Sequence, residues 1–113
     1  MYKLFYCFYG EETDDAEVSA EDPIALNNLA VLPALLNRAV TDGDFLGLLD
    51  AQGNTLQLMY EGDEDRYWLE IPVPAQGGSY GKHYRLDGIR EIFQALPPRF
   101  DVAAFPEFRF ESW

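Results

Sequence analysis

Residues 44–72 decide the fold, and they read DFLGLLD (44–50), AQGN (51–54), TLQLMYE (55–61), GDED (62–65) and RYWLEIP (66–72). Three apolar segments, rich in Leu, Tyr, Phe and Trp, are separated by clusters of Gly, Asn and Asp. Short apolar segments with turn residues between them are typical of antiparallel strands joined by hairpins. The stretch therefore predicts a three-stranded β-meander.

Alternation along the third segment divides its side chains between two faces, because successive residues of a strand point to opposite sides. One set is expected to face the core: Tyr67, Leu69 and Ile71. The other set is Arg66, Trp68 and Glu70. An indole between two charges is either covered by a helix or by the C-terminal tail, or is an exposed anchor for a partner. In the first segment, Gly47 interrupts the pattern and is a candidate site for a bulge.

The flanking residues predict further elements. YKLFYCFY (2–9) is apolar on both faces, which favours an interior strand. Helical spacing runs from 23 to 40, and we expect the well-formed part to start near Leu32 because Pro33 disrupts a helix interior. A short amphipathic helix is expected over 87–96, and EFRFESW (107–113) alternates as a last strand or lays its aromatic side chains over the sheet. The expected fold is α+β, one domain over 1–113, with an antiparallel sheet of about four to five strands and two helices packed on it.

Charge is the main compositional signal. The chain of 113 residues carries 20 acidic and 8 basic side chains, a net charge of −12. Such a chain repels nucleic acid and anionic membranes, so we expect neither as a partner and keep a basic protein open. No apolar run approaches the roughly 20 residues that cross a bilayer. Cys7, the single cysteine, suits a reducing compartment, and we expect a cytoplasmic protein without a signal peptide.

Two segments concentrate the acidic charge. Residues 11–22 hold seven carboxylates, and the predicted turn before Arg66 holds three more, Asp63, Glu64 and Asp65. Like charges at this density keep a segment extended and solvated, so a surface loop is the simplest interpretation. The functional alternative is a docking surface for a basic partner.

Catalytic, cofactor and metal motifs fail on inspection. Gly77 to Gly81 spells G-x-S-x-G, but two prolines precede it and the histidine follows too soon for a hydrolase. The same segment misses a phosphate-binding loop at two positions. One His and one Cys cannot make a zinc site, and the acidic turn lacks the glycine of a calcium loop. We therefore expect no enzyme, no cofactor and no metal.

One locally basic patch remains as an alternative site. Lys82, His83 and Arg85 follow the glycines in a segment, 76–85, that reads as a flexible loop. Such a loop could bind a small anion or close over a ligand in a cleft beside Lys82 and His83. It could equally pair with an acidic loop of the same chain.

The order of the elements carries a family resemblance. A helix around Leu32 to Val40, the meander, a short helix at 87–96, a terminal Trp113 and the segment RYWLE (66–70) follow one another. This order resembles small immunity proteins encoded beside bacterial contact-dependent and polymorphic toxins. The resemblance implies a protein that binds and occludes a cognate toxin.

Two other hypotheses stand beside an immunity protein. If the chain is an immunity protein, aromatic side chains anchor the partner and acidic groups steer it. The expected partner-binding residues are then Arg66, Trp68, Glu70, Asp63, Glu64, Asp65 and Tyr80. A small-ligand or anion-binding domain would instead use segment 76–85. A structural or oligomeric role is the third, because an N-terminal strand with two apolar faces could pair across a homodimer.

Overall fold

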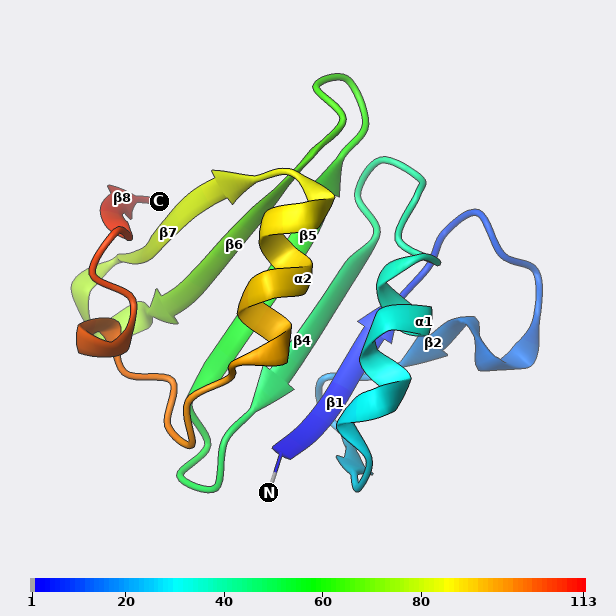
Figure 1. The fold of residues 1–113 in the computed structure, drawn as a ribbon, viewed down its shortest axis with the longest axis horizontal. Coiled ribbons are helices and arrows are strands. Elements are labelled where there is room, and N and C mark those ends of the chain that lie inside the picture. The colour runs from blue at the N-terminus through cyan, green and yellow to red at the C-terminus, as the bar shows by residue number, and fades with distance from the viewer. Residues whose placement is uncertain (1) are drawn as a thin grey trace.

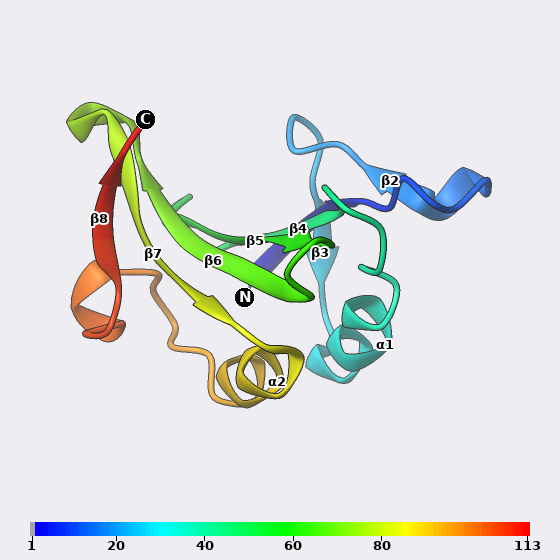
Figure 2. The ribbon, with the colours of Figure 1, turned by 90° about the horizontal axis from the view of Figure 1, so that it is seen from above.

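Residues 2–113 of the computed structural model form eight strands in one antiparallel sheet (Figures 1 and 2). The order is β2-β1-β4-β5-β6-β7-β8, and β3 also pairs with β1. The strands are β1 (Tyr2–Cys7), β2 (Glu17–Val18), β3 (Ile24–Leu26), β4 (Phe45–Leu49), β5 (Thr55–Glu61), β6 (Arg66–Val73), β7 (Gly78–Tyr84) and β8 (Arg109–Ser112). The α+β class and the antiparallel sheet are confirmed, whereas the expected four to five strands are wrong.

The meander is confirmed as β4, β5 and β6. Leu58 pairs with Leu46 on one side and with Leu69 on the other, so alternate side chains of all three strands share a face. Gly47 pairs directly with Phe5 and Gln57, and the ladder continues through it without a bulge. The predicted division of β6 also holds, because Tyr67, Leu69 and Ile71 are buried.

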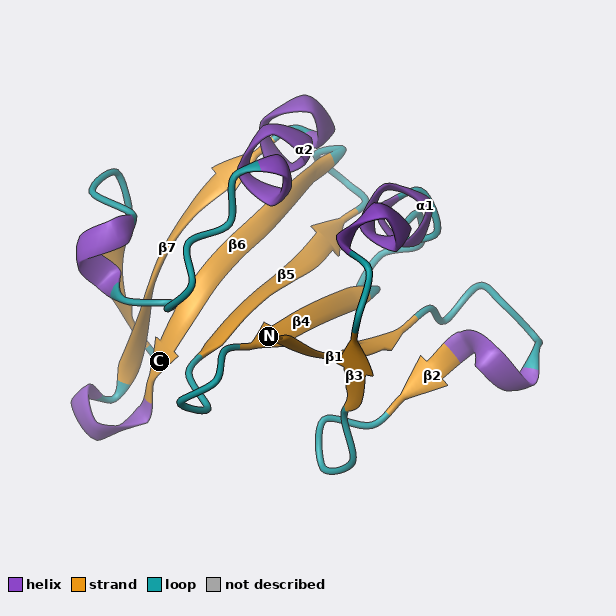
Figure 3. Ribbon diagram, turned by 60° about the horizontal axis from the view of Figure 1, so that its bottom comes forward, coloured by secondary structure: helices purple, strands orange, loops and turns teal. Residues whose placement is uncertain are grey.

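Two α-helices within residues 2–113 lie on one face of the sheet, side by side (Figures 2 and 3). Helix α1 (Leu32–Leu36) has Pro33 in its first turn, where the missing N–H costs nothing. A 3₁₀ turn (Leu29–Val31), capped by the Asn28 side chain, precedes it. Helix α2 (Leu86–Gln94) buries Ile89 and Phe93 and matches the helix expected over 87–96.

The core fills the space between the sheet and these helices. Its sheet side is built from leucines that are less than 4% exposed: Leu4, Leu46, Leu48, Leu56, Leu58 and Leu69. The segment after α2 adds Phe100, Phe105 and Phe108. Asp50 anchors this segment, because its carboxylate accepts the Phe100 N–H at 2.8 Å.

Two predictions about local structure are wrong. Segment 76–85 is not a loop, because Gly78–Tyr84 is strand β7, paired with β6 and β8. Segment 11–22 is not wholly a loop either, since it contains a 3₁₀ turn (Asp14–Ala16) and β2, which pairs with the end of β1. The last strand is confirmed as β8. Further 3₁₀ turns lie at Pro74–Gln76 and Val102–Ala104.

The interior position of the N-terminal strand is confirmed. Strand β1 pairs with β4 on one side and with β2 and β3 on the other. Its backbone groups are therefore used within the chain, and β1 cannot add to a second copy as the oligomeric hypothesis assumed.

Candidate functional site

The face of the sheet opposite the helices carries a row of mostly apolar side chains. Direct pairing across five adjacent strands places these side chains next to one another in the order Cys7, Phe45, Met59, Trp68 and His83, which we call the Trp68 row. Both α-helices lie on the other face (Figure 2). Met59, opposite Trp68, is 41% exposed. This face therefore presents aromatic and thioether groups to solvent.

Two glycines let the large rings of this face lie flat. A Cβ at Gly81 would come within 2.5 Å of Trp68 Cζ2, so the indole lies against bare backbone. A Cβ at Gly47 would likewise overlap the ring of Phe5. Because neither position has a side chain, both rings can lie directly against the backbone of the sheet. The Trp68 ring is partly buried in this way.

Polar and charged groups flank Trp68. His83, whose ring centroid lies 4.9 Å from that of Trp68, has its Nε2 atom 3.2 Å from Glu61 Oε2. Arg66 Nε donates to Glu61 Oε1 at 2.8 Å. Partial burial favours the neutral carboxyl, but the hydrogen bonds from Arg66 and His83 outweigh it and hold the pKa of Glu61 below its ordinary value. Glu70, on the same face, accepts a 2.7 Å hydrogen bond from Gln57.

An acidic end adjoins the Trp68 row. We use this name for seven exposed carboxylates: Glu12, Asp14, Asp15, Asp42, Asp63, Glu64 and Asp65. Strands β1 and β5 run in the same direction, so the segments that follow them lie at one end of the sheet. Asp42 joins them, because its Oδ1 accepts the Gly62 N–H at 2.8 Å. Asp42 and the turn 62–65, distant in sequence, thereby meet.

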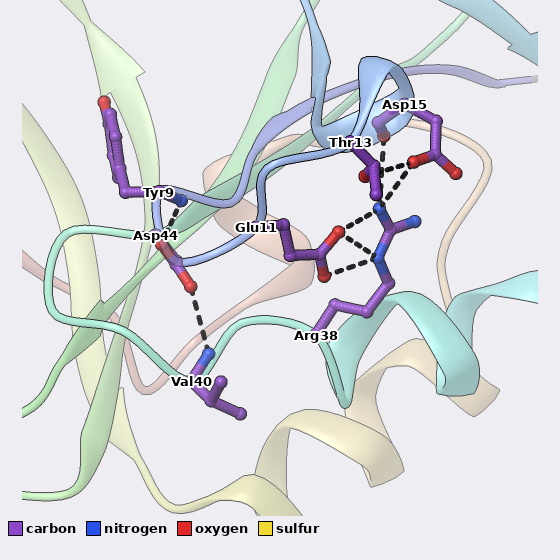
Figure 4. Close-up of polar contacts among 7 residues, drawn as sticks. All are labelled: Tyr9, Glu11, Thr13, Asp15, Arg38, Val40 and Asp44. Carbon is purple, nitrogen blue, oxygen red and sulfur yellow. Dashed lines mark hydrogen bonds and ion pairs between the residues drawn. The ribbon is translucent and has the colours of Figure 1, made fainter.

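Arg38 and Asp44 hold the acidic end in place (Figure 4). The Arg38 guanidinium donates to Glu11, with Nε 2.9 Å from Oε2, and lies 4.8 Å from the centre of the Phe8 ring. These hydrogen bonds raise the pKa of Arg38 and lower that of Glu11. Buried Asp44 accepts three backbone N–H groups, those of Tyr9 at 2.8 Å, Val40 at 3.1 Å and Thr41 at 2.9 Å. Sequence reasoning missed both residues.

The predicted partner-binding residues do not all lie together. Arg66, Trp68 and Glu70 share the open face, and the turn 62–65 borders it. Asp65 accepts a 2.8 Å hydrogen bond from Tyr60 and adopts a positive φ of 49°. Tyr80 lies on the helix side, where its ring contacts that of Phe110 at 5.3 Å between centroids. Tyr80 is therefore separate from the Trp68 row.

The three residues of the predicted basic patch do not lie together. Lys82 pairs with Leu69 and so lies on the helix side, whereas His83 lies on the open face. Lys82 Nζ is 3.6 Å from Glu107 Oε1, and Arg85 immediately precedes α2. Two of these groups thus pair with acids of the same chain, and they cannot close together over a single ligand.

Two grooves also lie on the surface of the protein. A groove of about 490 Å³ separates α2 from residues 104–108, and an apolar one of about 300 Å³ separates the two α-helices. Within residues 2–113 no group of three or more His, Cys, Asp or Glu side chains is placed to hold a metal ion. In the same range no helix has the length and apolarity to cross a bilayer.

Fold and surface together define a class: an α+β protein whose single antiparallel sheet has helices on one face and an open, partly apolar second face. Comparisons with protein-family models, curated protein sequences and solved structures found no match to this chain.

Proposed function

We propose that this protein is a non-enzymatic interaction protein that binds a basic protein partner, and that it acts in the cytoplasm as an immunity protein blocking a toxin domain. The observation that carries the proposal is the Trp68 row beside the acidic end. Partly buried aromatic side chains are typical anchors of protein interfaces. Surrounding charges of one sign speed the encounter with an oppositely charged partner.

Each part of the surface has a separate role in this proposal. Trp68 and Met59 supply apolar contact area, and the exposed carboxylates attract Lys and Arg side chains of the partner. The pairs that Glu61 makes with Arg66 and His83 are already formed in the free protein, so little order is lost on binding. Inhibition is stoichiometric occlusion of the partner, without turnover.

A binding experiment on a defined partner tests the proposal. The product of the open reading frame adjacent to this gene is expressed alone and together with this protein, and growth is recorded. We expect growth arrest when it is expressed alone and relief on co-expression. The proposal fails if that product neither binds this protein nor arrests growth.

Binding measurements on variants identify the surface that contacts the partner. We expect Trp68→Ala to weaken binding by about 30-fold, the effect of losing an interface anchor of about 2 kcal/mol. Trp113→Ala is the matched control, since Trp113 is 71% exposed and lies outside the row. Neutralising Asp63, Glu64 and Asp65 should lower the association rate and its salt dependence. Equal effects of the two tryptophan variants would remove the Trp68 row from the interface.

A further inference from the structure

Strand β8 forms an open edge of the sheet. Within residues 2–113 it pairs with β7 alone (Figure 1). Its four residues are all exposed. The Trp113 N–H donates to the Gly77 carbonyl at 2.9 Å, which shows that backbone groups of odd-numbered residues here face β7. Those of Phe110 and Ser112 consequently point to the open edge, where another strand could pair with them.

The chemistry of this edge suits a second copy of the chain. Phe110 is 41% exposed. Strand β8, residue 107 before it and the neighbouring strand β7 carry two basic and two acidic side chains, whose charges cancel: Lys82, Arg109, Glu107 and Glu111. The opposite edge of the sheet is formed by the two-residue strand β2 within the acidic segment 11–22. Two copies of a chain with net charge −12 repel least where the local charge is zero.

We propose that the protein self-associates by antiparallel pairing of β8 with β8 of a second copy. A two-fold axis would pass beside Phe110 and continue the sheet from one copy into the other. The β8 edge is separate from the Trp68 row, which lies on the open face of the sheet.

Charge selects the register of this pairing. Three registers pair outward-facing backbone groups of the two copies, and they are centred on Phe110, on Glu111 or on Ser112. The Ser112-centred register places Glu111 opposite Trp113 and forms no ion pair between the two strands. If the axis passes through Phe110, Arg109 of each copy lies opposite Glu111 of the other. If it passes through Glu111, the two Glu111 carboxylates face each other, and like charges directly opposite are unfavourable. The Phe110-centred register is therefore preferred.

Arg109 is able to make this contact. Its Nη1 atom donates to the carbonyls of Pro106 and Phe108, both at 3.1 Å. These bonds use one nitrogen of the guanidinium, and the side chain is exposed. A second nitrogen can then reach the Glu111 carboxylate of the second copy.

Cysteine cross-linking tests the register. In a Cys7→Ser background, Phe110→Cys would place the two Cα atoms about 5.5 Å apart, a separation that a disulfide can span. Ser112→Cys is the matched control, because its two copies would be four residue steps apart, about 13 Å. We expect a covalent dimer from Phe110→Cys only. Equal cross-linking of both variants, or of neither, overturns the proposed register.

Sedimentation equilibrium of the unmodified protein tests the association itself. The short interface predicts a weak dimer, so the mass should rise with concentration from 12.9 kDa towards twice that value. Arg109→Glu and Glu111→Arg should each weaken the dimer by about 3-fold to 30-fold, since each variant loses two cross-strand pairs. The double variant should restore it to within about twofold. A protein that stays monomeric at millimolar concentration overturns the proposal and leaves the edge to strands of other proteins.

Discussion

Gly47→Ala should destabilise the protein, although it replaces glycine with a better strand former. The new Cβ would overlap the Phe5 ring, which is only 5% exposed and lies across Gly47. All three nearest atoms belong to this ring, so the side chain rather than the backbone must move. Loss of phenylalanine burial costs about 1.5–3 kcal/mol. The lower chain entropy of alanine returns about 0.5–1 kcal/mol. The expected net loss is therefore about 1–2 kcal/mol.

A double-mutant cycle isolates this contact. Urea unfolding at neutral pH is measured for the wild type, Phe5→Ala, Gly47→Ala and the double variant. With the ring removed nothing opposes the new Cβ, so Gly47→Ala should be neutral or stabilising by up to about 1 kcal/mol in the Phe5→Ala background. The coupling free energy is then about 2 kcal/mol, well above the roughly 0.5 kcal/mol scatter of independent sites.

Additive effects of the two substitutions would refute this reasoning. So would a Gly47→Ala variant that loses the same stability with and without the Phe5 ring, because the backbone and not the ring would then be the obstacle. Gly81→Ala is a useful contrast. Its Cβ would lie 2.6 Å from the Leu69 carbonyl oxygen as well as close to Trp68, so removal of the indole should restore only part of the stability.

Three further predictions concern the polar contacts and one turn. Asp50→Ala should cost about 3 kcal/mol, because the buried carboxylate accepts N–H groups of Gln52, Asn54 and Phe100. Burial raises the pKa of Asp50, but these hydrogen bonds outweigh it and hold that pKa below its ordinary value. The loss in free energy of unfolding caused by Asp50→Ala should therefore be largest above about pH 4 and shrink below it. A loss that stays constant in acid would contradict this. Arg38→Gln should release segment 11–15 and speed its amide hydrogen exchange severalfold, whereas exchange in β5 should not change. Unaltered exchange in segment 11–15 would count against a holding role for the Arg38 contacts. Gly77→Ala should cost about 1 kcal/mol by thermal unfolding from backbone strain alone, since φ is +71° and nothing lies near its Cβ, and Gly77→Asn should cost less; equal losses would argue against strain.

Strand alternation was the most reliable signal in the sequence. It correctly separated Trp68 from Leu69 because the two faces of a strand differ by one residue, a strictly local property. The four-residue turn GDED also implies the pairing of Glu61 with Arg66, and hence of Met59 with Trp68. Sequence reasoning did not use this step, and so it missed Met59 as part of the apolar row.

Glycine-rich segment 76–85 shows why local composition misleads. Glycines favour loops in isolation, yet Gly78 and Gly81 lie inside β7. Gly81 is covered by the indole of Trp68, and a Cβ at Gly78 would lie 2.7 Å from Phe110 Cζ. These positions need glycine because neighbouring strands bring large rings against the backbone. No local signal reports such a contact.

The sequence by itself determined the meander, the alternation of its faces, the late helix and the acidity of the chain, because each depends on residues close together in the chain. Only the tertiary structure decided which face the helices cover, that the acidic segments at 12–15 and 63–65 share one end of the sheet, and that β8 is an edge while β1 is not. These features depend on strand order, which non-local pairing sets. Trp68 thus changed from an isolated indole between two charges into one member of a mostly apolar row that crosses five strands.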